Sequence, residues 1–233
     1  MSNPDLDIFG SLEYVSRGGQ KLEKALDHFD ISPVDKVCID CGASTGGFTD
    51  CLLKRGAKLV YAVDVGYGQL VWSLRTDKRV VTMERTNIRY VTPEMLEQKP
   101  ELAVIDLSFI SLALVLPVVH KLMGDPGEDD NPGTNPEVIC LIKPQFEAGK
   151  GRVGKKGVVR EPEIHKEVLD AFIQNSENAD FVVKGITYSP VKGPKGNIEY
   201  LGWLGKYKQT NEPENRIQID TGKIVSESHN ELG

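Results

Sequence analysis

The sequence predicts an α/β fold: a single Rossmann-like domain built on a doubly wound sheet of about seven strands. Short apolar runs alternate with amphipathic stretches, which is typical of a mainly parallel sheet covered by helices. A glycine-rich turn follows the first apolar run and leads into an amphipathic stretch. The length of 233 residues is ordinary for one domain with a buried core, and no internal repeat indicates a second unit.

The individual elements follow from hydrophobic periodicity and from residues that start or stop helices. Strands are expected at residues 36–40, 58–65, 79–83, 102–107, 138–143, 181–188 and 198–204, and helices at 20–30, 47–55, 112–123 and 162–176. Gly56 is a C-cap signal for the second helix. The last two strands are expected to pair antiparallel. Segment 124–136 is predicted to be a surface loop, and the polar tail after Lys206 to be loosely attached.

Composition excludes several classes of protein. No apolar run approaches the roughly 20 residues of a membrane span, and Met1–Gly10 lacks the pattern of a secretory signal. We therefore expect a cytoplasmic protein with no membrane partner. The four cysteines (Cys38, Cys41, Cys51 and Cys140) offer no second ligand pair at short spacing, so structural thiols are favoured over redox or metal use and no metal site is expected.

The segment from Val37 to Phe48 is the strongest local signal for a ligand site. It is a hydrophobic strand ending in Asp40, followed by a turn with Gly42, Gly46 and Gly47. The spacing is not GxGxxG and no Gly-Lys-Ser/Thr follows, so a phosphate group is not the expected ligand. Asp64 ends the next strand, where an acid commonly binds the hydroxyls of a nucleoside ribose. The pattern favours S-adenosylmethionine, with another nucleotide or a purely structural turn as alternatives.

The residues expected to bind the cofactor lie in this turn and at the carboxyl ends of neighbouring strands. They are Asp40, Gly42, Ser44, Gly46, Gly47, Phe48, Asp64 and Asp106. Two alternatives stay open. Asp106, which follows an Ala-Val-Ile run, could cap the next helix, and Asp40 could only organise its turn.

Three further charged residues stand in apolar surroundings. Lys143 follows a Val-Ile-Cys-Leu-Ile run, which places it at the tip of a central strand, and burial of a lysine calls for a partner. Glu199 lies near the start of the last apolar run, and Lys21 precedes the first core helix. Taken singly, Lys143 could be a lysine that extends from a strand end to solvent, and Lys21 and Glu199 could be surface residues.

Six blocks of sequence, running in one order from Tyr14 to Leu204, resemble the hemolysin-A-type (TlyA-like) family. They span residues 14–22, 40–50, 61–70, 104–111, 141–149 and 193–200. The family is similar to FtsJ-type ribose methyltransferases, so the resemblance implies a class I S-adenosylmethionine-dependent methyltransferase fold. It also implies a catalytic tetrad of Lys21, Asp106, Lys143 and Glu199.

The resemblance implies methylation of cytidine 2′-hydroxyls in 16S and 23S ribosomal RNA, with ribosomal RNA or ribosomal subunits as partners. Lys143 is the candidate base, which must be neutral to accept a proton, or else an ammonium that orients the hydroxyl. The alternative function is a non-catalytic RNA-binding or ribosome assembly factor. A membrane-lysing hemolysin is disfavoured because the sequence has no span, no signal and no strongly amphipathic basic helix.

The resemblance also sets the expected domain organisation. Family members usually begin with a small S4-type RNA-binding domain, whereas only residues 1–13 precede the first block here, so we expect a short N-terminal extension. Residues 14–205 form the expected methyltransferase domain and 206–233 a polar tail. The net charge of −6 argues mildly against RNA binding. A local basic segment offsets it: Lys143, Lys150, Arg152, Lys155, Lys156 and Arg160 form an RNA-docking patch or a solvated loop.

Overall fold

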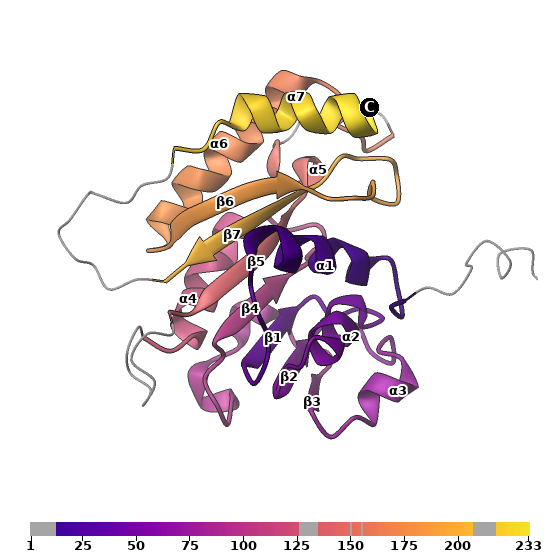
Figure 1. Cartoon of the computed structure of the whole chain (residues 1–233), viewed down its shortest axis with the longest axis vertical. Coiled ribbons are helices and arrows are strands. Elements are labelled where there is room, and N and C mark those ends of the chain that lie inside the picture. Colours follow the sequence, from indigo (N-terminus) through magenta and orange to yellow (C-terminus); the bar gives the residue numbers. More distant parts are fainter. Residues whose placement is uncertain (1–12, 126–134, 150, 155, 207–217) are drawn as a thin grey trace, which may run out of the picture.

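The computed structural model describes residues 13–125, 135–149, 151–154, 156–206 and 218–233 (Figure 1). Seven strands form one sheet in the order β3-β2-β1-β4-β5-β7-β6. The strands are β1 (Val37–Cys41), β2 (Leu59–Val63), β3 (Val80–Met83), β4 (Leu102–Ile105), β5 (Glu137–Ile142), β6 (Val182–Tyr188) and β7 (Tyr200–Gly205). The first five in spatial order are parallel, and β7 runs antiparallel to both β5 and β6. The predicted doubly wound α/β sheet is confirmed.

Helices cover both faces of this sheet. The α-helices are α1 (Gly18–Phe29), α2 (Gly47–Lys54), α3 (Trp72–Arg75), α4 (Leu116–Leu122), α5 (Pro144–Glu147), α6 (Pro162–Asn178) and α7 (Thr221–Leu232). Three short 3₁₀ turns, η2 (Ile88–Tyr90), η3 (Pro93–Met95) and η4 (Leu112–Leu114), lie between strands. Residues of α1 and α2 pack with one face of the sheet, whereas α4, α6 and α7 pack with the other. The strands between them are nearly continuously apolar, as expected for a sheet buried on both sides.

The predicted elements are recovered with shifted ends. The helix expected at 112–123 is instead a 3₁₀ turn followed by α4, because Pro117 has no amide hydrogen and suits only the first turn of a helix. Gly56 follows α2 with φ of 91°, which confirms it as a helix stop. The antiparallel pairing of the last two strands is also confirmed. The one-turn helices α3 and α5 were not predicted, since they are too short to show a period.

The prediction of a loosely attached tail is wrong for residues 218–233. These residues include α7, which packs on α6 and buries Val225 in the core. Thr221 Oγ1 donates to Asp170 Oδ1 at 2.7 Å, and Ser228 Oγ lies 3.1 Å from the hydroxyl of Tyr200. Much of the buried face of α7 is therefore polar, which weakens its hydrophobic pattern. Residues 207–217 lie outside the described part of the chain, as do 1–12 and most of the predicted loop at 124–136.

The four cysteines are buried and free, in agreement with the predicted structural role. Cys38 and Cys41 both lie in β1 but belong to the cores on opposite faces of the sheet. Burial raises the pKa of Cys38 and of Cys51 to about 12, so both remain uncharged thiols near neutral pH.

Candidate active site

The candidate site lies at the carboxyl edge of the parallel strands, where the strand order reverses. β1 pairs with β2 on one side and with β4 on the other. The chain therefore leaves β1 and β4 in opposite directions, and open α/β sheets bind their ligands in the crevice that this leaves. The glycine-rich turn follows β1 directly, and Asp106 follows β4 directly. Sequence reasoning placed both segments at this edge.

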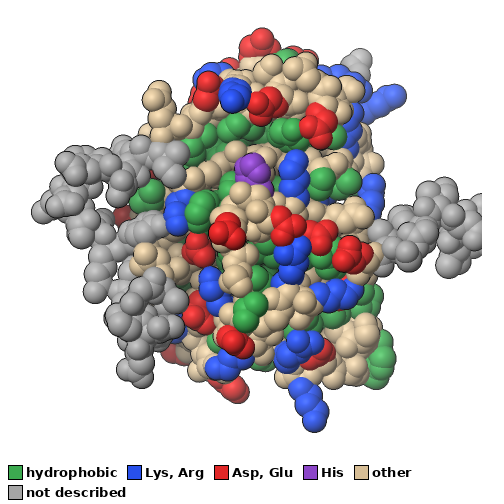
Figure 2. Space-filling view, viewed as in Figure 1, with side chains coloured by type: hydrophobic (Ala, Val, Ile, Leu, Met, Phe, Trp, Pro, Cys, Tyr) green, Lys and Arg blue, Asp and Glu red, His purple; other side chains and the backbone are tan. Residues whose placement is uncertain are grey.

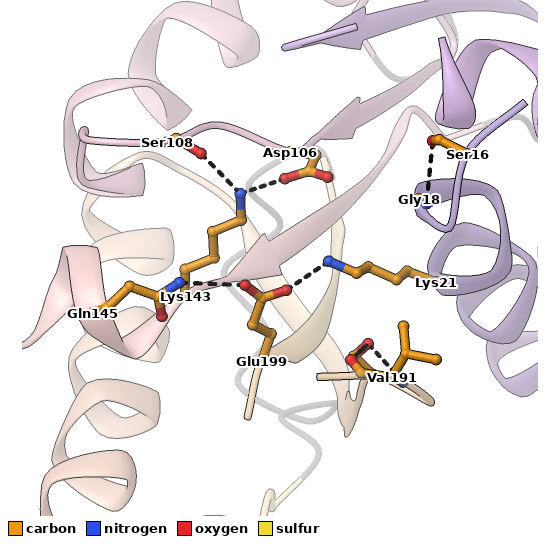
Figure 3. A network of polar contacts seen from close by, with 10 residues as sticks. Ser16, Gly18, Lys21, Asp106, Ser108, Lys143, Gln145, Val191 and Glu199 are labelled. Atoms are coloured by element: carbon orange, nitrogen blue, oxygen red, sulfur yellow. Dashed lines mark hydrogen bonds and ion pairs between the residues drawn. The ribbon is translucent and has the colours of Figure 1, made fainter. Parts of the chain in front are cut away.

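Two of the four predicted catalytic residues form an ion pair in this crevice (Figure 3). Nζ of Lys143 lies 2.6 Å from Oδ1 of Asp106 and donates to the hydroxyl of Ser108 at 3.2 Å. The pair forms because β4 and β5 are neighbouring parallel strands, so the residues that follow them meet at one edge. The Lys143 side chain is 11% exposed. Asp106 therefore serves as a partner of Lys143, and Ser111 rather than Asp106 caps the following 3₁₀ turn.

The other two predicted catalytic residues form a second ion pair. Nζ of Lys21 lies 2.7 Å from Oε2 of Glu199, whose side chain is only 1% exposed. Gln145 donates from Nε2 to the other carboxylate oxygen of Glu199 at 3.2 Å (Figure 3). Because β7 runs antiparallel to β5, the start of β7 lies beside the end of β5, and Glu199 reaches the same crevice. The structure thus brings together all four residues as two ion pairs.

The glycine-rich turn is held in a conformation that needs glycine at two positions. Gly42 has φ of 97°, and a Cβ there would lie 2.3 Å from the backbone oxygen of Asp106. Gly46 has φ of 103°, and a Cβ there would lie 2.3 Å from the side chain of Leu74. Glycine is the residue that accepts these angles without a steric penalty. The turn therefore closes tightly against both the β4 edge and α3.

Asp64, the predicted ribose-binding acid, holds the turn in the structure. Its Oδ2 accepts from the backbone N–H of Ser44 at 2.8 Å, and its Oδ1 accepts from Gly66 at 2.7 Å. Ser44 has a positive φ of 49°, so the Asp64 bond stabilises an uncommon backbone conformation. A carboxylate oxygen can accept more than one hydrogen bond, so Asp64 retains acceptor capacity on each oxygen.

Asp40 is fully buried beneath the turn. Its Oδ2 accepts from the Thr49 hydroxyl at 2.6 Å, whereas Oδ1 has no hydrogen-bond partner within the described residues. Burial raises the pKa of Asp40 to about 7, the Thr49 hydrogen bond opposes this rise, and the charge of Asp106 adds to it. An orphaned buried carboxylate oxygen at this edge is compatible with a ligand that brings a donor or a positive charge.

A cleft of about 220 Å³ opens between the glycine-rich turn and the start of α1. Its walls include the predicted residues Lys21, Gly42, Ser44, Gly47, Phe48 and Asp106. The other predicted site residues, Asp40, Gly46, Asp64, Lys143 and Glu199, do not line it. Sequence reasoning did not single out the remaining wall residues, which are Ser16, Arg17, Gly18, Ala43, Thr45, Lys192 and Pro194. Several of these lie in the same sequence blocks as Lys21, Gly42 and Glu199, which is the signal that could have identified them.

An exposed aromatic residue contacts Phe146, whose ring lies beside Lys143. Phe109 is 88% exposed, adopts a left-handed φ of 64° and lies 4.9 Å from the Phe146 ring, centroid to centroid. Phe146 in turn lies 5.8 Å from Nζ of Lys143. A bulky residue with positive φ is strained, and such strain tends to be retained at functional positions. The sequence alone gave no reason to select Phe109.

The described residues of the predicted basic segment differ in their surroundings. Lys143 points into the crevice and Arg152 pairs with Glu167, while Lys156 and Arg160 are exposed. Lys150 and Lys155 lie outside the described residues. On the face shown in Figure 2, acidic and basic side chains are interspersed over much of the surface.

Comparison with known proteins identifies the family to which this fold belongs. Residues 14–206 match the family of FtsJ-like methyltransferases. The chain belongs to this family. TlyA of Mycobacterium tuberculosis, named a 16S/23S rRNA (cytidine-2′-O)-methyltransferase, is 49% identical over 191 residues, which cover 82% of this FtsJ-like methyltransferase and 68% of TlyA.

Solved structures agree with this assignment. A protein from Streptococcus thermophilus that carries a hemolysin name is 48% identical, with a TM-score of 0.86 over 95% of this FtsJ-like methyltransferase and 76% of that chain. An S-adenosylmethionine-dependent methyltransferase from Mesorhizobium loti shares the fold at 13% identity, with a TM-score of 0.57 over 82% of this chain and all (100%) of its own. The fold is therefore that of class I methyltransferases, as predicted. Within the described residues, no helix has the length and apolar character needed to cross a membrane.

Proposed function

We propose that this enzyme transfers a methyl group from S-adenosylmethionine to the 2′-hydroxyl of a cytidine in 16S and 23S ribosomal RNA. The name of the TlyA relative supports the substrate, and the family supports methyl transfer. The observation that carries the proposal is that Asp106 belongs both to the cleft wall and to the Lys143 ion pair. Asp106 thereby connects the cleft, where the cofactor is proposed to bind, with Lys143, where the acceptor hydroxyl is proposed to lie. Because the proposed substrate is ribosomal, the enzyme would act in the cytoplasm.

The residues present fit S-adenosylmethionine. The tight turn with its positive-φ glycines admits a ligand close to the backbone, and the carboxylate of Asp106 in the cleft wall can accept a hydrogen bond from that ligand. Gly42, Ser44, Gly47 and Phe48 would line its site, and Asp64 would accept from its ribose hydroxyls. When bound, S-adenosylmethionine supplies a methyl group on a positively charged sulfur, which is already activated toward an oxygen nucleophile.

The work left to the protein is to align the acceptor hydroxyl and to take its proton. Correct alignment of two reacting groups can supply about 7–11 kcal/mol of a barrier. We assign the base to Nζ of Lys143, which accepts the proton of the 2′-hydroxyl in its neutral form. Lys143 donates to Ser108 and pairs with Asp106, so it must lose a proton before it acts as a base. Lys21 and Glu199 position the acceptor from the opposite wall.

The acceptor nucleotide also needs a surface on which its base can rest. Sequence-specific recognition of RNA commonly uses unstacked bases, and proteins hold such bases against aromatic side chains. We assign this role to Phe109, because it is exposed and contacts Phe146, whose ring lies beside Lys143.

The test uses ribosomal subunits from a strain that lacks this gene and S-adenosylmethionine labelled in its methyl group. We expect label to enter both rRNAs, and each methylation to protect one phosphodiester from alkaline cleavage, because a methylated 2′-oxygen cannot attack the neighbouring phosphate. Cofactor affinity is measured in parallel by calorimetry. If the protein binds both cofactor and subunits but transfers no label, the non-catalytic assembly role replaces this proposal. Label in protein, or in RNA without protection from alkali, would exclude a ribose hydroxyl as the acceptor.

A further inference from the structure

We propose that Gln145 is a positioning residue that orients Glu199 toward Lys21. The inference deepens the proposed function and rests on it, because Glu199 belongs to the acceptor side of the site. Gln145 lies in α5, two residues after Lys143, on the turn that follows the central strand β5. It was not among the predicted site residues.

The first argument is how the oxygens of Glu199 are distributed. Oε2 pairs with Nζ of Lys21 at 2.7 Å, and Oε1 accepts from Nε2 of Gln145 at 3.2 Å. Lys21 comes from α1 and Gln145 from α5, so donors on two separate elements fix the plane of one carboxylate (Figure 3). A buried carboxylate held by a single donor could still rotate about its last side-chain bond, whereas two donors define its orientation.

The second argument is the orientation of the Gln145 amide. Its Oε1 is buried and has no hydrogen-bond partner within the described residues. Turning the amide over would place this oxygen against Oε1 of Glu199, where two acceptors repel each other. The side chain therefore gives its NH₂ group to Glu199 and leaves its own carbonyl unpaired. An unpaired buried carbonyl destabilises a fold, so the contribution of Gln145 to folding does not explain the presence of an amide here.

The third argument is that the surroundings leave Oε1 of Glu199 little room. A Cβ at Gly193 would lie 2.4 Å from this oxygen, so the loop between β6 and β7 packs directly over it. Gln145 approaches the same oxygen from the β5 side. Because Gln145 and Lys143 lie on one short turn, the amide links the Glu199–Lys21 pair to the segment that carries the proposed base. A displacement of Glu199 would thus alter the acceptor wall opposite Lys143.

The test compares wild type with Gln145→Leu, which keeps the size of the side chain and removes its hydrogen bond. We expect kcat for methylation of ribosomal subunits to fall roughly tenfold or more, since small displacements of positioning groups are costly. KM for subunits and cofactor affinity are expected to stay close to wild type. The melting temperature is expected to change little, because the variant takes a donor from Oε1 of Glu199 but also removes the unpaired carbonyl. Gln174→Leu, on the exposed surface of α6, is the matched control.

Two further measurements separate positioning from other roles. If Gln145 acts through Glu199, the double variant Gln145→Leu/Glu199→Gln loses no more activity than Glu199→Gln alone. If the activity losses of the two single variants multiply in the double variant, the inference is overturned. A raised KM with normal kcat in Gln145→Leu would also overturn it, in favour of direct contact between Gln145 and the substrate.

A readout without turnover keeps this inference apart from the proposed function. The rate at which an amine-reactive acylating reagent modifies Lys21 can be followed by mass spectrometry. This rate reports how well the ion pair with Glu199 protects Lys21. We expect faster acylation in Gln145→Leu, with the buried Lys206 as an internal reference. Unchanged Lys21 reactivity would overturn the role of Gln145 whatever the activity. Raised reactivity together with an inactive wild type would support the positioning and refute the proposed methylation alone.

Discussion

Lys143 and Asp106 end two neighbouring parallel strands, and Nζ of the lysine lies 2.6 Å from Oδ1 of the aspartate. The pair is therefore set by the backbone of the sheet rather than by a mobile loop, and Asp106 also faces the cleft. Positions fixed by neighbouring strands hold reacting groups within narrow limits. The first prediction tests the lysine of this pair.

Lys143→Ala is expected to lower methyl transfer by about a hundredfold or more, because it removes the proposed base. Cofactor affinity measured by calorimetry should stay close to wild type, since Lys143 does not line the cleft. Lys166→Ala, an exposed lysine on α6, serves as the control and should leave both quantities unchanged. Transfer at a near-normal rate by Lys143→Ala would show that the base has been assigned to the wrong residue.

Asp64→Ala is expected to weaken S-adenosylmethionine binding by about tenfold or more, because a hydrogen bond to a charged group contributes about 1.5–3 kcal/mol. The variant loses the proposed ribose contact and also the support that Asp64 gives to Ser44 and Gly66. Calorimetric titration measures the affinity, and Asp77→Ala in a surface loop is the control. Affinity equal to that of wild type would place the ribose of the cofactor elsewhere.

Phe109 offers a prediction in which stability and activity move in opposite directions. Phe109→Gly relieves the left-handed backbone strain, so the melting temperature should rise, whereas RNA methylation should fall. Stacking of a base on an aromatic ring contributes about 1–3 kcal/mol, so the loss of kcat/KM is expected to be roughly fivefold or more. Phe109→Trp should retain most activity. A glycine variant that methylates as well as wild type would argue that no base rests on Phe109.

The stability of the fold should depend on pH through Asp40. Its pKa rises from the ordinary 3.8 to about 7 on folding, so the folded protein binds a proton that the unfolded chain releases between these values. The contribution is fully present below about pH 4 and is lost as pH rises through about 7, with a maximum of about 4 kcal/mol. Asp40→Asn should remove this decline. Denaturant unfolding at several pH values measures it, and parallel pH curves for variant and wild type would contradict the assignment.

Most of the fold, and the positions of Asp106 and Lys143 at strand ends, could be predicted because both depend on local pattern. The run before Asp40 and the one before Lys143 are apolar enough to define strands, and residues that follow parallel strands meet at one edge. Lys21 and Glu199 could not be placed together by pattern alone, and only the family resemblance joined them. Their contact depends on the antiparallel insertion of β7 beside β5, which no local signal reports.

The other features that the sequence did not reveal also depend on contacts between distant segments or on backbone conformation. The attached face of α7 is held partly by the hydroxyls of Thr221 and Ser228, which read as surface residues. Nothing in the sequence around Gln145 indicates a role in the site, which becomes visible only through its hydrogen bond to Glu199. Phe109 reads as an apolar residue at the end of a strand, and only its exposure and backbone angle distinguish it.

The place of β7 in the sheet has a consequence for synthesis on the ribosome. Among the described strands β7 emerges last, yet it lies between β5 and β6 in the finished sheet. A nascent chain that has released β5 can already assemble the glycine-rich turn, but Lys21 must wait for a partner 178 positions later. During that interval the edge of β5 is open to unwanted strand pairing. The order of translation thus builds the cleft first and completes the second ion pair only when β7 closes the sheet.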